Sequence, residues 1–114
     1  VCFEINPVFA EQIKDLDTHG RIEVIQKDVS QICQYVKNDS VDAVISGLPL
    51  ANFNPKEISQ IFTSLEKILK KKSPYIQFQY TLKLARLFQK SFSKVSRKFC
   101  FLNFPPAFVF SCIP

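Results

Sequence analysis

The sequence predicts an α/β fold with a mostly parallel sheet and a C-terminal antiparallel hairpin. Apolar runs with strand character alternate with segments whose apolar residues recur at helical spacing, a pattern typical of parallel sheets with helices on both faces. Asn6-Pro7 and Asn54-Pro55 mark helix starts, because asparagine caps a helix and proline fits its first turn. Two final apolar runs flank the short turn "NFPPA", which favours a hairpin added to the sheet.

The first half of the chain is expected to contain two strands and two helices before the third strand. The first strand is expected at Val1–Ile5, and the helix that follows it is expected to stop at Gly20. The second strand is expected at Ile22–Gln26, and Ser30 is expected to cap a short helix. The third strand is expected at Val41–Ser46.

The second half begins with the most clearly marked helix. Glu57 stands three residues after Asn54, as in a capping box, and the apolar residues behind it have helical spacing. Lys70–Lys72 are expected to end this helix, where its dipole favours cations. The remaining elements are a strand at Tyr75–Tyr80, a basic amphipathic segment at Leu82–Phe92, and final strands at Val95–Leu102 and Ala107–Ile113.

The net charge of +5 is unevenly distributed along the chain. Val1–Pro55 contains four basic and eight acidic residues, whereas Lys56–Pro114 contains eleven basic and two acidic residues. A positive half attracts phosphate backbones or anionic lipid headgroups. The alternative is that these charges simply solvate helix faces.

Several kinds of site are poorly supported by the composition. The single histidine, His19, cannot build a histidine-based metal site or a supported Ser-His or Cys-His pair, and two glycines are too few for a GxGxxG or P-loop motif. The cysteines have irregular spacing and apolar neighbours, which predicts buried free thiols in a reducing compartment rather than disulfides or metal ligands. They are Cys2, Cys33, Cys100 and Cys112.

Acidic residues follow the first two predicted strands. Ligands of parallel α/β sheets bind beyond the carboxyl ends of the strands, so polar residues there are candidates for a site. Glu4 can accept hydrogen bonds from both hydroxyls of a ribose, and Asp28 can accept one from an adenine amine. Each could instead be an ordinary turn or capping acid. Gln77, Gln79 and Tyr80 occupy the corresponding end of the fourth strand.

The third strand ends abruptly in Ser46–Pro49, within "DAVISGLPL". We refer to these four residues as the SGLP loop. Gly47 allows close approach of a ligand, and Pro49 holds the loop rigid. Rigid backbone carbonyls can accept protons from a target amine and so orient its lone pair toward an activated electrophile. The alternative is an ordinary Gly-Pro turn.

Taken together, these segments resemble the class I S-adenosylmethionine (SAM)-dependent methyltransferases. "VCFEINPVFAEQI", "IEVIQKDV" and "DAVISGLPL" look like the second, third and fourth motifs of that family. More closely, "SGLPL", "YIQFQYT" and "NFPPAFVF" resemble the bacterial phospholipid N-methyltransferases, which are related to the ribosomal RNA adenine dimethyltransferases. The resemblance implies SAM as cofactor. It implies cofactor-binding roles for Glu4, Ile5, Asp28, Val29 and Ser46, and positioning of the target by Ser46, Gly47, Leu48 and Pro49.

The resemblance also implies a reaction and a location. The reaction is methyl transfer to the amine of phosphatidylethanolamine. The basic half would face an anionic membrane, with Leu82–Arg97 as the expected contact. The protein is then expected in the cytoplasm, peripheral to the inner face of the membrane.

One family feature is missing, which leaves alternatives open. The acidic, glycine-rich first motif, its strand and its helix have no counterpart, and in the family this strand lies between those carrying Glu4 and Ser46. We therefore expect residues 1–114 to be the C-terminal portion of a single methyltransferase domain. One alternative is an RNA adenine methyltransferase, although Leu50 after Pro49 cannot stack on a base and Phe53 is displaced. Another is a non-catalytic remnant that binds a membrane or a partner.

Overall fold

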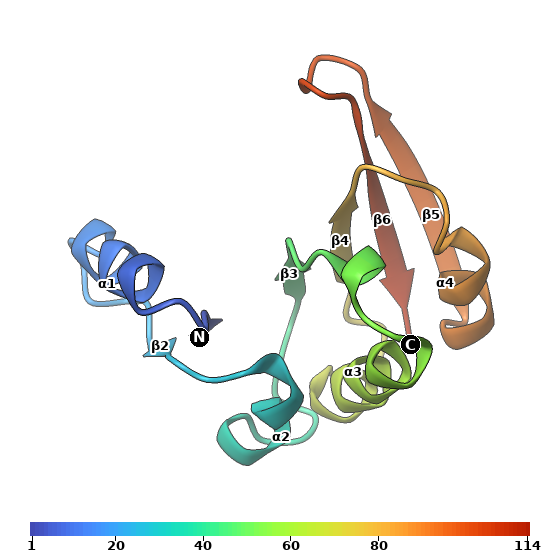
Figure 1. Cartoon of the computed structure of the whole chain (residues 1–114). Helices are drawn as coiled ribbons and strands as arrows, with labels where there is room; N and C mark the ends of the chain where they lie inside the picture. The colour runs from blue at the N-terminus through green and yellow to red at the C-terminus, as the bar shows by residue number, and fades with distance from the viewer.

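The structure, a computed structural model, describes residues 1–114 and has the α/β architecture expected from the sequence (Figure 1). Strands and helices alternate until a C-terminal pair of strands. In chain order the elements are β1 (Cys2–Phe3), α1 (Pro7–Leu16), β2 (Val24–Ile25), the 3-10 helix η1 (Val29–Gln31), α2 (Ile32–Tyr35), β3 (Val44–Ser46), the 3-10 helix η2 (Leu50–Asn52), α3 (Pro55–Ile68), β4 (Tyr75–Gln79), α4 (Ala85–Ser91), β5 (Lys94–Cys100) and β6 (Ala107–Ile113).

The strands form two separate sheets. β1 and β2 pair in parallel as a two-stranded sheet, and the other strands form a sheet of order β3-β4-β6-β5. β3 is parallel to β4, whereas β6 runs antiparallel to both β4 and β5. The expected C-terminal hairpin is therefore present, and it joins the sheet through β6, which lies between β4 and β5.

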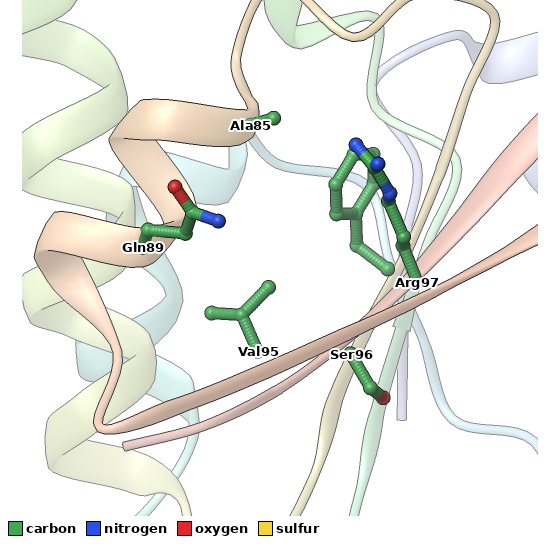
Figure 2. A pocket seen from close by; sticks show the side chains of 6 residues that line it. Ala85, Gln89, Val95, Ser96 and Arg97 are labelled. Atoms are coloured by element: carbon green, nitrogen blue, oxygen red, sulfur yellow. The ribbon is translucent and has the colours of Figure 1, made fainter.

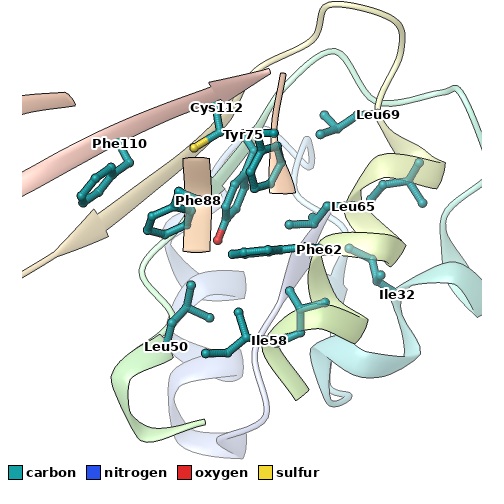
Figure 3. Close-up of a cluster of buried hydrophobic side chains, with 13 residues drawn as sticks. Ile32, Leu50, Ile58, Phe62, Leu65, Leu69, Tyr75, Phe88, Phe110 and Cys112 are labelled. Atoms are coloured by element: carbon teal, nitrogen blue, oxygen red, sulfur yellow. The ribbon is translucent and has the colours of Figure 1, made fainter. Parts of the chain in front are cut away.

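The hydrophobic core lies between α3, α4 and one face of the four-stranded sheet (Figure 3). The ring of Phe62 on α3 lies 6.0 Å from that of Tyr75 on β4 and 5.0 Å from that of Phe92. Phe88 of α4 stacks on Phe110 of β6 with 4.7 Å between the ring centres. Aromatic pairs at these separations stabilise a core by about 0.5–1.5 kcal/mol each beyond the burial of their area.

The opposite face of this sheet carries apolar side chains outside the core. Successive strand residues point to opposite faces, so Ile76 and Phe78 alternate with the buried Tyr75 and Gln77 and are themselves only half-buried. Ile45 of β3 is 83% exposed. The expectation that helices cover both faces is therefore wrong for this sheet.

The start of α3 agrees with the sequence in detail. The Asn54 carboxamide oxygen accepts hydrogen bonds from the backbone N–H groups of Lys56 and Glu57, both at 3.0 Å, and the Glu57 carboxylate accepts one from Asn54 N–H at 2.8 Å. This is a complete capping box. The end differs from the expectation, because α3 stops at Ile68 and Lys70 leaves the helix to pair with Asp42 at 2.7 Å.

Other local expectations are corrected by hydrogen bonding and burial. Asp28, not Ser30, caps the short helical segment, since its carboxylate accepts the Ser30 N–H at 2.8 Å. All four cysteines are free thiols, but only Cys112 is buried and Cys33 is exposed. Gly20 has φ +62°, which fits its expected role in the turn after α1, although the helix itself ends at Leu16. None of the helices combines the length and the apolar character that crossing a bilayer requires.

Candidate functional site

A cavity of about 720 Å³ opens between the two sheets. One wall is formed by β1 and the segment that follows β2, and the other by β3 and the SGLP loop. Side chains of α3, among them Ile61, Leu65 and Ile68, form its apolar base. The residues to which the resemblance assigns roles all line this one cavity, although they come from three separate segments: Glu4, Ile5, Asp28, Val29, Ser46, Gly47, Leu48 and Pro49. Gln77, Gln79 and Tyr80, at the end of the fourth strand, do not line it.

The two acidic residues stand on the same wall and also serve the local fold. The Glu4 carboxylate accepts the Asn6 N–H at 2.7 Å, just before α1. The Asp28 carboxylate accepts from the Ser30 side chain and backbone N–H, and these bonds hold its pKa below the ordinary carboxyl value. The local roles considered from the sequence are thus present, since Glu4 accepts a hydrogen bond within the turn before α1 and Asp28 caps η1. A carboxylate has about four acceptor sites, so one or two local bonds leave capacity for a ligand.

A buried polar network supports the SGLP loop from below. The Gln77 side chain on β4 is fully buried, and its amide nitrogen donates to the Leu48 carbonyl at 3.0 Å. The Tyr75 hydroxyl donates to the Gln77 amide oxygen. Burial raises the pKa of Tyr75 well above its ordinary value, against a smaller opposing effect of the Ser46 hydroxyl, so the phenol stays protonated and remains a donor. Ser46 in turn accepts the Leu48 N–H at 3.3 Å.

The hydrogen bonds of the loop leave one carbonyl free. The Leu48 carbonyl accepts from both Gln77 and the Leu50 N–H, which lies at 2.8 Å, and the Pro49 carbonyl accepts the Asn52 N–H at 2.9 Å. The Gly47 carbonyl accepts no hydrogen bond within the chain. A Cβ built on Gly47 would also meet no atom within 4 Å. The loop therefore presents Gly47, rather than Leu48, as its accessible acceptor.

Gln77 and Phe53 contribute to the site in ways that were not predicted from the sequence. The alternation of "YIQFQY" places Gln77 and Gln79 on the buried face of β4, and a glutamine inside an apolar strand is a signal of a specific partner. Gln79 is 5% exposed, and its amide nitrogen is buried without a hydrogen-bond partner. Phe53 is half-buried and lines the cavity.

A second, smaller pocket of about 210 Å³ lies between α4 and β5 (Figure 2). Arg97 and Val95 of β5 face Gln89 and Ala85 of α4 across it, and none of its lining residues belongs to the SGLP loop. It lies within the basic segment that was expected to contact a membrane. No group of three or more metal-ligating side chains occurs in the structure.

Comparisons with known proteins identify the fold. No family model matches the sequence, and no curated protein is similar to it in sequence. A SAM-dependent methyltransferase from Archaeoglobus fulgidus superposes with a TM-score of 0.70 at 10% identity, covering 98% of this chain and 74% of that one.

Two further solved structures superpose over almost the whole chain. A protein from Pyrococcus horikoshii has a TM-score of 0.71 at 14% identity, with 98% of this chain and 69% of that one covered. A precorrin-6y methyltransferase from Geobacter metallireducens has a TM-score of 0.70 at 11% identity, with 98% and 66% covered. The chain therefore has part of the Rossmann-like fold of the class I SAM-dependent methyltransferases.

Proposed function

We propose that this chain acts in SAM-dependent methyl transfer to an amine, with the phosphatidylethanolamine headgroup as the acceptor. The observation that carries the proposal is the single cavity that brings Glu4 and Asp28 opposite the SGLP loop. The fold of the neighbouring structures supports the same cofactor.

The residues of the cavity suit SAM. Glu4 supplies acceptors for the ribose hydroxyls, and Asp28, ionised because its pKa is lowered, accepts from the adenine amine. Ile5 and Val29 supply apolar wall beside these carboxylates, and Ser46 stands on the opposite wall. When bound, SAM supplies an already activated methyl group, so the protein needs neither a nucleophile nor a metal for the transfer.

The task left to this chain is to hold the acceptor amine. The free carbonyl of Gly47 can accept an N–H of the amine and so direct its lone pair into the cavity. The network of Gln77, Tyr75 and Ser46 fixes the loop, which limits the orientations that the carbonyl can take. Positioning of this kind contributes to the rate by removing the entropic cost of orientation.

The choice of a phospholipid as the acceptor rests on the charge distribution of the chain. No acidic residue follows Glu66, whereas ten lysines and arginines do, which favours an anionic surface such as a membrane with phospholipid headgroups. A cytoplasmic location at the inner face of the membrane is part of the proposal.

Methyl transfer to an adenine of RNA is the second candidate, and Phe53 is the observation that favours it. Its half-buried ring lines the cavity, where it could stack on a base. Leu50, directly after Pro49, is fully buried in the core and does not reach an acceptor.

The test measures SAM affinity by calorimetry and methyl transfer from radiolabelled SAM. Glu4→Ala is expected to weaken SAM binding by roughly 1–3 kcal/mol, the cost of lost charge-assisted hydrogen bonds. Glu11→Ala is the matched control, because Glu11 is exposed on α1 and pairs only with Lys14. Equal affinities of the two variants would remove Glu4 from the site.

The acceptor is tested by offering phosphatidylethanolamine vesicles and a structured RNA in parallel. Label in the lipid supports the proposal, and label in RNA alone supports the second candidate. A chain that binds vesicles but shows no SAM binding would instead be a non-catalytic remnant.

A further inference from the structure

We propose that the turn between β5 and β6 inserts into the interface of an anionic lipid bilayer. The turn, residues 101–106, projects beyond the rest of the sheet (Figure 1). Its three large apolar side chains are almost completely in water, since Phe101 is 75%, Leu102 96% and Phe104 99% exposed. Single exposed apolar residues are common on soluble proteins, but a cluster on a projecting turn marks an interaction site.

The turn is built to display these side chains. The Asn103 side chain donates to the Pro105 carbonyl at 2.7 Å, which closes the turn on itself. Just below it, the rings of Phe99 and Phe108 pair across β5 and β6 at 5.0 Å, which adds to the main-chain ladder supporting the turn. Folding the core therefore makes no use of Phe101, Leu102 or Phe104.

The charges behind the turn are complementary to anionic lipid. Arg97 and Lys98 of β5 are exposed, and neither belongs to either of the two ion pairs of the structure. Apolar side chains at a tip with basic residues behind it allow burial in the acyl boundary together with attraction to anionic headgroups. Two prolines and Leu102 next to the phenylalanines favour hydrocarbon over nucleic acid, which offers flat bases and polar edges.

The turn also lies at the end of the sheet where the SGLP loop is found, which is the carboxyl end of β3 and β4. β3 and β4 are parallel and end at Ser46 and Gln79, and Gln79 is paired with Phe108 at the start of β6. The SGLP loop and the turn are thus at the same edge. Insertion would bring the lipid headgroups to the side of the molecule where the Gly47 carbonyl is free. This consequence rests on the proposed function, whereas the insertion itself does not.

The absence of tryptophan from the chain allows a direct test. Phe104→Trp places a single indole at the tip, and Leu16→Trp places one on α1, where Leu16 is 78% exposed, as a control. On addition of phosphatidylcholine vesicles that contain phosphatidylglycerol, the tip indole is expected to shift to shorter wavelength and to be quenched by brominated acyl chains. The control indole is expected to do neither. Unchanged emission at the tip, or a shift only with structured RNA, would overturn the proposal.

A second variant tests the energetic contribution of the tip. Replacing Phe101, Leu102 and Phe104 together by serine is expected to weaken vesicle binding by about tenfold or more, because apolar area is no longer removed from water. The same number of serine substitutions at exposed apolar positions of α1, namely Val8, Phe9 and Leu16, is expected to leave vesicle binding unchanged. Equal loss in both triple variants would contradict insertion by the turn.

SAM affinity, measured on the same samples, separates this proposal from the proposed function. The tip variant is expected to bind SAM as the parent chain does. If the tip inserts but the parent chain binds no SAM, only the proposed function fails. If SAM binds but the tip stays in water, only the insertion fails.

Discussion

At the scale of single residues, Gly47 and Gln77 have different roles in the SGLP loop. Gly47 carries the free carbonyl and has open space around its Cα, whereas Gln77 fixes the carbonyl of the next residue from below. The first residue faces a ligand and the second faces the core. Substitutions at these two positions should therefore affect different observables.

Gly47→Ala is expected to impair methyl transfer without unfolding the protein. Its φ is not in the left-handed region and the added methyl group meets no atom within 4 Å, so the free energy of unfolding should change by less than about 1 kcal/mol. The methyl group projects beside the free carbonyl and should hinder the acceptor amine. Chemical denaturation and transfer kinetics check the two parts, and full activity in the variant would exclude close approach at Gly47.

Gln77→Leu is expected to destabilise the protein by roughly 1–3 kcal/mol, because the Tyr75 hydroxyl would lose its buried acceptor and the loop its brace. Gln89→Leu is the matched control, since Gln89 is exposed on α4. Adding Tyr75→Phe to the first variant should recover part of the loss, because no hydroxyl then remains unsatisfied. Additive losses in urea denaturation would argue against a network.

The parts of the candidate site that could be predicted are those in which the residue type at the end of a strand indicates what it can bind. Glu4, Asp28 and the SGLP loop could be proposed because carboxylates and a Gly-Pro turn stand where parallel strands stop, and the structure places them around one cavity. Which carbonyl stays free could not be predicted, because that depends on the long-range bond from Gln77 to Leu48.

At the scale of elements, the turn from α1 to β2 depends on one carboxylate. Asp17 accepts backbone N–H bonds from Ile22 at 2.6 Å and from Arg21 at 3.0 Å, and these bonds lower its pKa. A group whose pKa is lowered by folding stabilises the protein above its unfolded pKa, and this contribution is lost as the pH falls through the folded value.

The amide resonances of Arg21 and Ile22 are therefore expected to titrate together below the ordinary carboxyl value of 3.8. Asp17→Asn should abolish that titration. Asp15→Asn, two residues earlier and within α1, is the control and should leave the titration in place. A titration of both amides at or above 3.8 in an NMR pH series would contradict the assigned bonds.

Element boundaries followed local signals where those signals are complete. The capping box fixed the start of α3, and the expected final strand coincides with β6. The prediction for Ser30 was wrong because the helical segment already begins at Val29, so that Asp28 is its N-cap and Ser30 donates to it. The prediction that Lys70–Lys72 end α3 was wrong because the chain leaves the helix at Leu69. The Lys70 N–H donates to the Val41 carbonyl, and the Lys70 ammonium donates to Asp42, which is 28 residues away in the sequence.

At the scale of the whole molecule, charge is segregated along the chain, whereas exposed apolar side chains occur in both halves. The acidic half contains the small sheet, α1 and β3, and the basic half contains the other three strands of the four-stranded sheet and its projecting turn. The α/β class and the hairpin could be predicted from alternation and turn residues. The position of β6 inside the sheet could not, because strand order is set by contacts between residues far apart in the sequence.

The separation of the two sheets has a consequence for handling the protein. β1 and β3 both face the cavity and each is paired on one side only, so their unpaired N–H and C=O groups form two open templates for an extended chain. Ile45, 83% exposed on β3, adds an apolar side chain without a neighbouring lysine or proline to discourage pairing. Solutions of this chain are therefore expected to fail by edge-to-edge association before they fail by heat, and dilution should protect them better than cooling.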